Sequence, residues 1–468
     1  MLTTLHLKNF KCWRDTGPIV LKPLTILFGT NSSGKSSLEQ FFLMLRQTVE
    51  SSDRKLVLHP GDRDSAVNLG SFEEMVYRRD KTARLEFSFA WELPQKLEVE
   101  DPKTRQKWTG NRMAFECKVG PHNGRQSHLG VDNFAYHLKM GDTDVLNAKV
   151  NGTVDSTKTE YKLTADPYEL VRVTGRPWQL GTPGWFYRFP EQASAYYQNA
   201  DFVQDFSLAL ETMLRSVCYL GPLRSRGERL YQWAGGEPAN VGYEGEHTIS
   251  ALLAAKERKM NTGRKKRTRH FQQLIAEQLH QLQLIDGFEV RQISANRKEY
   301  EVKIKTPGAP DWVDLPDVGF GISQVLPVVV QSFYAAPHSI LFIEQPELHL
   351  HPKAQANLAD LFIDVLASWE QGQPRGVQLI IETHSEHFLN RLQRRIAEGA
   401  VVGEDIACYF AHTTGTESKL DALKMDMFGN IENWPPEFFG DSMGDLMAMQ
   451  RIAAEKRAKN SNTAAIGR

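Results

Sequence analysis

Cysteine is scarce in this chain of 468 residues, which contains Cys12, Cys117, Cys218 and Cys408. The four lie far apart and form no CxxC pair or cysteine–histidine cluster, which argues against a structural zinc site and against a disulfide framework. This usage is typical of a reducing compartment, so the expected location is the cytoplasm.

Long apolar runs and an excess of one charge are also lacking. No apolar run approaches the length of a membrane span, and the first thirteen residues mix charged with apolar side chains, so we expect neither a signal peptide nor a membrane partner. The formal net charge is −1, from 56 Lys and Arg against 57 Asp and Glu. Any contact with nucleic acid must therefore come from a local patch. The hydrophobic content of 41% is enough for two or three domains with buried cores.

A phosphate-binding motif is present near the start of the chain. Residues 29–36 read GTNSSGKS, which matches GxxxxGK[ST]. The motif follows an apolar run at 24–28 and precedes another at 38–45, as expected of a strand, a loop and a helix. Loop amides and the helix N-terminus would hold phosphate, Lys35 would reach the β and γ phosphates, and Ser36 would ligate Mg²⁺. The predicted nucleotide-binding residues are Gly29, Thr30, Asn31, Ser32, Ser33, Gly34, Lys35, Ser36 and Ser37.

A second motif lies in the C-terminal half, where the apolar run 339–343 ends in Glu344, Gln345, Pro346 and Glu347. A carboxylate at the carboxyl end of a parallel strand beside a phosphate loop can hold Mg²⁺, so Glu344 is a predicted metal ligand together with Ser36. The alternative is an acidic turn that only ends the strand.

The rest of the chain divides by composition. We expect an N-terminal lobe over 1–90, an inserted β-rich region over 91–215, a helical and hairpin region over 216–310, a C-terminal lobe over 311–454 and a disordered tail over 455–468. Residues 247–285 have a helical pattern, interrupted by a basic run at 264–270. Alternating residues at 288–293 and 300–304 predict a β-hairpin.

The motifs carry a family resemblance. Residues 7–11, 21–25 and 29–37 resemble the opening of ABC-type ATPases of the SMC, RecF and overcoming-lysogenization-defect (OLD) group. Residues 344–352 are similar to the DEPELHLHP segment of RecF-like and OLD-like proteins, and 380–385 resembles their switch strand. The resemblance covers about 1–90 and 310–395. It implies an α/β fold: an ABC-type P-loop ATPase head, with a mixed sheet and an antiparallel β lobe, plus an inserted β-rich and helical middle region.

Residues 317–324, DVGFGISQ, resemble the group's signature motif. The resemblance implies that the signature contacts the γ-phosphate bound by another subunit, so that ATP would join a head-to-tail dimer or larger homo-oligomer. The implied contact residues are Gly319, Gly321, Ser323 and Gln324. Taken alone, the segment is equally compatible with a glycine turn and a serine helix cap.

One position departs from the family pattern. In the DEPE form the first acid aids the metal and the second polarises the attacking water, but here these positions hold Glu344 and Gln345. Glutamine can orient a water but cannot accept its proton at neutral pH. We therefore expect slow hydrolysis of ATP, with Gln345, Glu347 and His384 as catalytic residues: Glu347 as the candidate base and His384 at the γ-phosphate.

Partner contacts have two candidate segments. Arg264, Lys265, Lys266, Arg267 and Arg269 form the best local patch for nucleic-acid phosphates, although a solvated loop is the simpler interpretation. Residues 433–439, NWPPEFF, resemble the ending of bacterial ATPases related to OLD proteins, many of them encoded beside nucleases or phage-defence genes. This segment either packs on the head or docks a partner.

Three functions follow from these features. The first is an ATP-driven sensor or scaffold of an anti-phage defence complex, which controls a separate nuclease or toxin. The second is a RecF-like repair ATPase or clamp that binds DNA. The third, the ATPase subunit of a transporter, is least favoured because the signature and the ELHLHP segment differ from transporter types.

Overall fold

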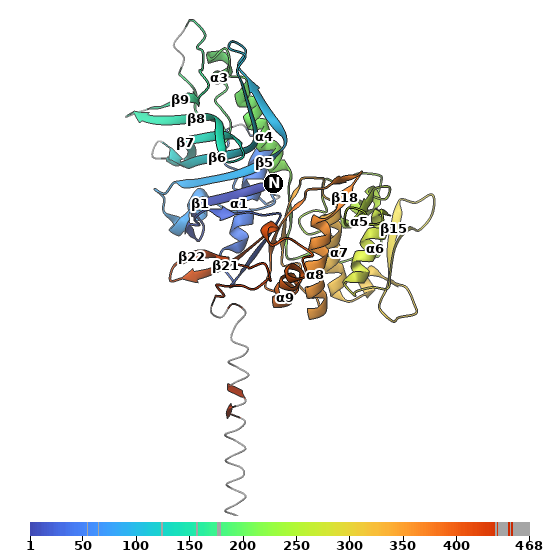
Figure 1. Cartoon of the computed structure of the whole chain (residues 1–468). Coiled ribbons are helices and arrows are strands. Elements are labelled where there is room, and N and C mark those ends of the chain that lie inside the picture. Colours follow the sequence, from blue (N-terminus) through green and yellow to red (C-terminus); the bar gives the residue numbers. More distant parts are fainter. Residues whose placement is uncertain are drawn as a thin grey trace, which may run out of the picture.

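A six-stranded sheet lies at the centre of the computed structural model (Figure 1). Its order is β10 (Val217–Leu220), β17 (Ile340–Glu344), β20 (Gln378–Glu382), β4 (Leu24–Gly29), β21 (Ile406–Thr414) and β22 (Glu417–Leu423). The first five strands are parallel and β22 is antiparallel. The carboxyl ends of β17, β20 and β4 therefore meet at one edge, where α/β sheets bind ligands.

The structure describes residues 1–53, 55–63, 65–122, 125–155, 158–175, 179–435, 438, 448–449 and 451–452. The predicted tail over 455–468 lies outside these residues, as does most of the final part of the NWPPEFF segment.

An antiparallel sheet of eight strands forms the second layer, at the top left of Figure 1. Its strands are β1 (Leu2–Phe10), β2 (Trp13–Asp15), β3 (Ile19–Val20), β5 (Leu85–Glu100), β6 (Lys107–His122), β7 (Arg125–Met140), β8 (Thr143–Asp155) and β9 (Lys158–Asp166). β5 pairs with β1 on one side and with β6 on the other, and it runs through residue 90 without a break. The N-terminal strands and the β-rich region thus share one sheet.

Helices cover both faces of the central sheet. α1 (Lys35–Glu50) and α4 (Phe202–Arg215) pack in one core with the antiparallel sheet, and α5 (Thr248–Ala254), α6 (Phe271–Gln281), α7 (Phe320–Tyr334), α8 (Pro352–Leu366) and α9 (Glu386–Ala397) form a second core. Phe342 points into the first core, and its neighbours Leu341 and Ile343 point into the second. This explains the continuous apolar strands, since both sheet faces are buried. The α/β fold with a mixed sheet and an antiparallel lobe is confirmed.

Short elements complete the chain. They are α2 (Phe72–Met75), η1 (Tyr77–Arg79), α3 (Gln192–Tyr196), β11 (Tyr231–Gln232), β12 (Lys259–Asn261), β13 (Arg269–His270), β14 (Gly287–Gln292), β15 (Glu299–Lys305), β16 (Val313–Asp314), η2 (Leu315–Asp317), β18 (Trp369–Glu370), β19 (Gln373–Pro374) and η3 (Gly403–Asp405). The predicted hairpin is confirmed as β14 and β15, which pair antiparallel. Among the described helices, none has the length and apolar character needed to cross a membrane.

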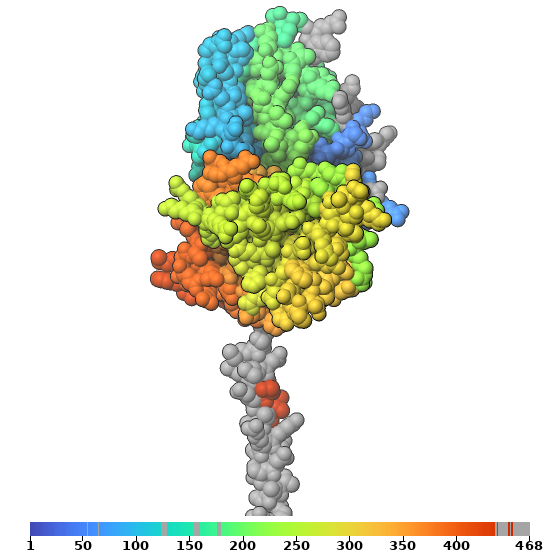
Figure 2. Space-filling view, turned by 90° about the vertical axis from the view of Figure 1, so that its right-hand side faces the viewer, coloured from blue at the N-terminus to red at the C-terminus, as the bar shows by residue number. Residues whose placement is uncertain are grey.

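The helical prediction for 247–285 was only partly right. α5 and α6 are separated by β12 and β13, which pair with each other, and β12 also pairs with β18. Gly263, with φ of 153°, lies in the connection between the two strands, a backbone conformation that a helix does not allow. The basic run therefore lies on a hairpin. Figure 2 shows the green-to-yellow segment that contains it covering much of this face, below the β lobe.

Candidate nucleotide and metal site

The predicted phosphate loop connects the end of β4 with the start of α1, as the motif requires. Gly29 has a φ of 147°, and a Cβ placed there would lie 2.1 Å from the backbone oxygen of Ala411 on β21. Gly34 has a φ of 98°, and its Cβ would lie 2.3 Å from Cys12 Sγ. Glycine is therefore required at both positions by backbone conformation and by close neighbours.

Trp13, on β2 of the antiparallel sheet, holds the end of this loop. Its buried indole Nε1 donates to the backbone oxygen of Gly34 at 3.2 Å and to Ser37 Oγ at 2.8 Å. The side chain of Ser37, a predicted nucleotide-binding residue, thus already forms a hydrogen bond within the protein. The sequence analysis did not identify Trp13 as a site residue, because Trp13 lies outside the phosphate-loop motif and only the fold brings β2 next to the loop.

Lys35 and Ser36 both contact a residue that the motifs did not single out. Lys35 is buried, and its Nζ donates to the backbone oxygens of Gly29 and Thr30 at 3.2 and 2.9 Å. The same Nζ lies 3.7 Å from Glu382 Oε1, and Ser36 Oγ donates to Glu382 Oε2 at 2.7 Å. Burial lowers the pKa of Lys35 and the nearby carboxylates oppose that shift. Glu382 therefore joins the two side chains expected to bind phosphate and metal.

Strand order explains the position of Glu382. Glu344 ends β17 and Glu382 ends β20, where the two are directly paired in the sheet. Because β20 lies between β17 and β4, Glu382 is one strand closer to the phosphate loop than Glu344. The rule that selected Glu344, a carboxylate ending a buried parallel strand, applies equally to Glu382. The signal was available in the sequence, but the order of the strands was not.

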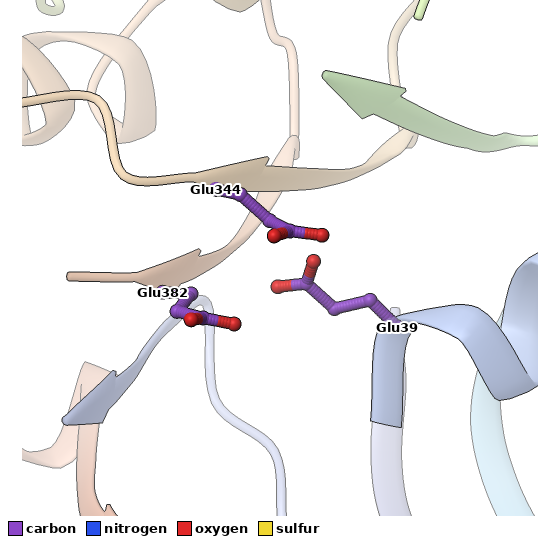
Figure 3. A group of neighbouring side chains, drawn as sticks. All are labelled: Glu39, Glu344 and Glu382. Carbon is purple, nitrogen blue, oxygen red and sulfur yellow. The ribbon is translucent and has the colours of Figure 1, made fainter. Parts of the chain in front are cut away.

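Glu39 completes a group of three acids. It lies on α1 one turn after Lys35 and is fully buried, and in the part of the chain that the structure describes no donor reaches either of its carboxylate oxygens. Glu39, Glu344 and Glu382 point toward one another (Figure 3), and one oxygen from each lies within 4.8 Å of the others. Burial and the charges of Glu344 and Glu382 raise the pKa of Glu39 well above its usual range, and burial also raises the pKa of Glu382.

The chemistry of this group fits a magnesium ion. Carboxylates and a hydroxyl supply the hard oxygen ligands that Mg²⁺ prefers. Buried like charges are costly unless a positive charge lies among them. The described residues supply two such charges here, Lys35 beside Glu382 and Arg224 at the end of β17, against three carboxylates. The predicted ligands Ser36 and Glu344 thus lie beside the same cluster.

Two residues tie the end of β17 to the surrounding elements. The Tyr219 hydroxyl donates to Glu344 Oε1 at 2.7 Å. Arg224 is buried and donates to the backbone oxygens of Glu344 and Gln324, at 2.6 and 3.4 Å. Burial lowers the pKa of Arg224 to about 10, so it stays charged at neutral pH. Arg224 therefore links the predicted metal-binding strand to the signature helix α7.

The predicted signature residues lie at the start of α7. Gly319 is exposed, and a Cβ on Gly321 would lie 2.9 Å from the backbone oxygen of His349. Ser323 Oγ donates to the backbone oxygen of Phe320 at 2.9 Å. Gln324 is instead buried, and its Nε2 donates to the backbone oxygen of Arg224 at 3.0 Å. Among the described residues, no hydrogen bond joins these four to the phosphate loop of the same chain.

The predicted catalytic residues follow β17 and β20. Gln345 is half-buried with a φ of 43°, and its backbone N–H donates to the backbone oxygen of Glu382 at 2.7 Å. Glu347 is buried, its Oε1 accepts from the backbone N–H of His384 at 2.7 Å, and its Oε2 has no hydrogen-bond partner among the described residues. Burial raises the pKa of Glu347. His384 is exposed beside Lys35, and partial desolvation and the Lys35 charge lower its pKa. A carboxylate with a raised pKa is suited to accept a proton near neutral pH.

Three solved structures are similar to the chain at low identity. The Smc head bound to the C-winged helix domain of ScpA is 12% identical, with a TM-score of 0.42, over 91% of this chain and 98% of that one. The SMC head domain from Thermotoga maritima is 10% identical, with a TM-score of 0.36, over 90% of this chain and 99% of that one. The third structure is the Smc head domain with an extended coiled coil, bound to the C-terminal domain of ScpA derived from Pyrococcus furiosus. It is 11% identical, with a TM-score of 0.39, over 97% of this chain and 99% of that one.

Sequence comparison assigns two segments. No curated protein matches the chain significantly. Residues 403–449 match a family described as a protein of unknown function, DUF3696. Residues 249–389 match the family described as AAA ATPase domain. This segment contains Glu344 and Glu382, so its similarity to an ATPase domain includes the two strand ends that lie beside the predicted phosphate loop.

Proposed function

We propose that the chain binds ATP with Mg²⁺ at this site and hydrolyses it, as an ABC-type ATPase. The observation that carries the proposal is the contact of both Lys35 and Ser36 with Glu382, beside Glu344 at the neighbouring strand end. Lys35 would bind the β and γ phosphates, and Ser36, Glu344 and Glu382 would hold the metal. A metal ion there supplies positive charge to the phosphate oxygens.

Hydrolysis is proposed to be slow, with Glu347 as general base. Gln345 occupies the usual position of that base and cannot take a proton, whereas Glu347 is buried next to the end of the switch strand. Changing Glu347→Gln should lower ATP turnover by about 10²- to 10⁴-fold, the usual contribution of a general base, while ATP binding is kept. The matched control is Glu386→Gln, an exposed acid at the start of α9. Turnover at the parental rate would remove Glu347 from the reaction.

The ATP site is proposed to be completed by a second copy of the chain. Support comes from the exposed start of α7, at Gly319 and Phe320, which leaves this surface free for a partner. In such a head-to-tail dimer, Lys35→Ala and Ser323→Arg should each abolish hydrolysis. Mixed before assembly, the two variants form one intact site per heterodimer, so about a quarter of the parental activity should return. No recovery, or a strictly monomeric protein with and without ATP, would refute the composite site.

We further propose that the ATP-bound assembly senses phage infection or scaffolds a defence complex, and controls a separate nuclease or toxin. This part rests on the sequence resemblance of the motifs and of the tail at 433–439. The test is to purify the full chain with the products of the neighbouring genes, with and without ATP, and to measure mass and co-purification. A replication or repair protein as the ATP-dependent partner would favour the RecF-like alternative.

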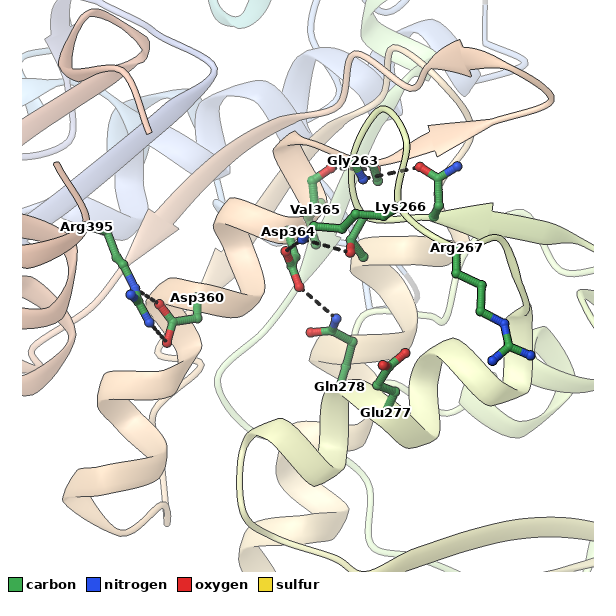
Figure 4. A network of polar contacts seen from close by, with 12 residues as sticks. Gly263, Lys266, Arg267, Glu277, Gln278, Asp360, Asp364, Val365 and Arg395 are labelled. Atoms are coloured by element: carbon green, nitrogen blue, oxygen red, sulfur yellow. Dashed lines mark hydrogen bonds and ion pairs between the residues drawn. The ribbon is translucent and has the colours of Figure 1, made fainter. Parts of the chain in front are cut away.

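The alternative function requires binding of duplex DNA, for which the structure gives limited support. Lys266 Nζ lies 3.2 Å from Asp364 Oδ1 (Figure 4). Arg269 donates to Glu277 Oε1 at 2.8 Å, so two cations of the basic run are already neutralised. Arg264, Lys265 and Arg267 are exposed. If DNA is bound here, neutralising these three residues should weaken the binding and reduce its dependence on salt.

A further inference from the structure

We propose that Glu39, Glu344 and Glu382 bind one divalent cation, of the Mg²⁺ or Mn²⁺ type, directly and in the absence of nucleotide. The inference deepens the proposed ATPase function and rests on it to the extent that the cation would be in place when ATP arrives. Cation binding itself requires no nucleotide, so it can be tested independently.

The first argument is the state of Glu39. Glu344 accepts a hydrogen bond from Tyr219, and Glu382 accepts one from Ser36, but both oxygens of Glu39 lack a partner among the described residues. A buried acceptor without a partner costs stability. The side chain is nonetheless aimed into the cluster (Figure 3) rather than away from it. An occupant that accepts lone pairs from all three carboxylates would remove this cost.

The second argument is charge. When all are ionised, the three carboxylates outnumber the two buried positive charges beside them, the Lys35 ammonium and the Arg224 guanidinium. The cluster therefore favours a cation over an anion. The spacing of at most 4.8 Å between the ligand oxygens suits oxygens that surround a single ion.

The third argument is the contrast with an ordinary phosphate-loop magnesium. Mg²⁺ at such sites is usually bound by one or two carboxylates, several waters and the substrate phosphates, because it loses water reluctantly. Here three carboxylates converge before any phosphate is bound. They come from the phosphate-loop helix α1 and from strands β17 and β20. The cation would thus join the loop helix to both acidic strand ends and order the site in advance.

The test uses the full chain, stripped of metal with a chelator and free of nucleotide. Mn²⁺ is titrated in, and free Mn²⁺ is followed by electron paramagnetic resonance. The parent should bind one Mn²⁺ per chain. Glu39→Gln, which keeps the size of the side chain, should weaken this binding by at least about tenfold, since loss of even an outer partner commonly costs about 10- to 100-fold. Glu50→Gln, on the same helix but paired with Arg46 at the surface, is the control and should bind as the parent does.

The outcomes separate the two proposals. No stoichiometric Mn²⁺ binding by the parent, or equal affinity in Glu39→Gln with its fold intact by circular dichroism, would overturn the inference. Binding of a fluorescent ATP analogue is measured in parallel. If the protein binds Mn²⁺ but not the ATP analogue, the inference stands and the proposed function is rejected. If it binds the analogue but binds no Mn²⁺ in the absence of nucleotide, the inference is rejected and the proposed function stands.

Discussion

Replacing Glu39 by glutamine should make the metal-free protein more stable. In the folded chain, burial and the charges of Glu344 and Glu382 raise the pKa of Glu39 well above the ordinary value of 4.5. The folded state therefore keeps a proton on Glu39 at pH values where the unfolded chain has lost it. Stability of the parent consequently falls as pH rises above about 4.5, and it goes on falling until the folded pKa is passed. Glutamine does not titrate and avoids this loss.

The structure bounds the size of the effect. Each pH unit between the ordinary and the folded pKa costs about 1.36 kcal/mol, so the interval from 4.5 to pH 7 limits the gain at pH 7 to about 3 kcal/mol. The lower bound of the gain is about 1 kcal/mol, which is the lower end of the free-energy cost of a buried polar group without a hydrogen-bond partner.

The assay is thermal unfolding followed by circular dichroism in chelator, at pH 5 and at pH 7. Glu39→Gln should melt roughly 1–3 °C above the parent at pH 7, with a smaller difference at pH 5. With Mn²⁺ at 100 times the parent's dissociation constant, the parent gains about 2.7 kcal/mol and a variant that binds tenfold more weakly gains about 1.4 kcal/mol, so the difference in melting temperature should shrink. A glutamine variant that melts at or below the parent in chelator at pH 7 would refute the reasoning.

Three further predictions concern the loop and its neighbours. Gly29→Ala should abolish binding of an ATP analogue, because its Cβ would overlap the backbone oxygen of Ala411; Gly236→Ala, in open space, is the control and should bind normally. Trp13→Phe should weaken analogue binding about five- to tenfold, the equivalent of about 1 kcal/mol for the lost hydrogen bonds to Gly34 and Ser37, and unchanged affinity would show that these bonds do not hold the loop. Tyr219→Phe should lower the free energy of unfolding in denaturant by about 1.5–3 kcal/mol through loss of the hydrogen bond to Glu344, and an unaltered unfolding midpoint would contradict this.

Local pattern was enough for the parts of the site that depend on neighbours in sequence. The phosphate loop, the strand that ends at Glu344 and the β14–β15 hairpin are all recognisable because the spacing of glycines, apolar residues and turn residues encodes them directly. The helical expectation for 247–285 was partly wrong, since periodicity does not reveal that β12 pairs with β18 more than a hundred residues later. The assigned roles of Gln345, Glu347 and His384 remain predictions.

By itself, the sequence predicted a nucleotide site, the loop expected to bind phosphate, and a strand-end acid beside it. Only the tertiary structure decided which acids meet. The order of β17, β20 and β4 brings Glu382 to Ser36, and the packing of α1 on the sheet aims Glu39 at both strand ends. The physical reason is that pairing between distant parallel strands and the burial of one helix face are set by the whole core, whereas a loop motif is set by a few consecutive backbone angles.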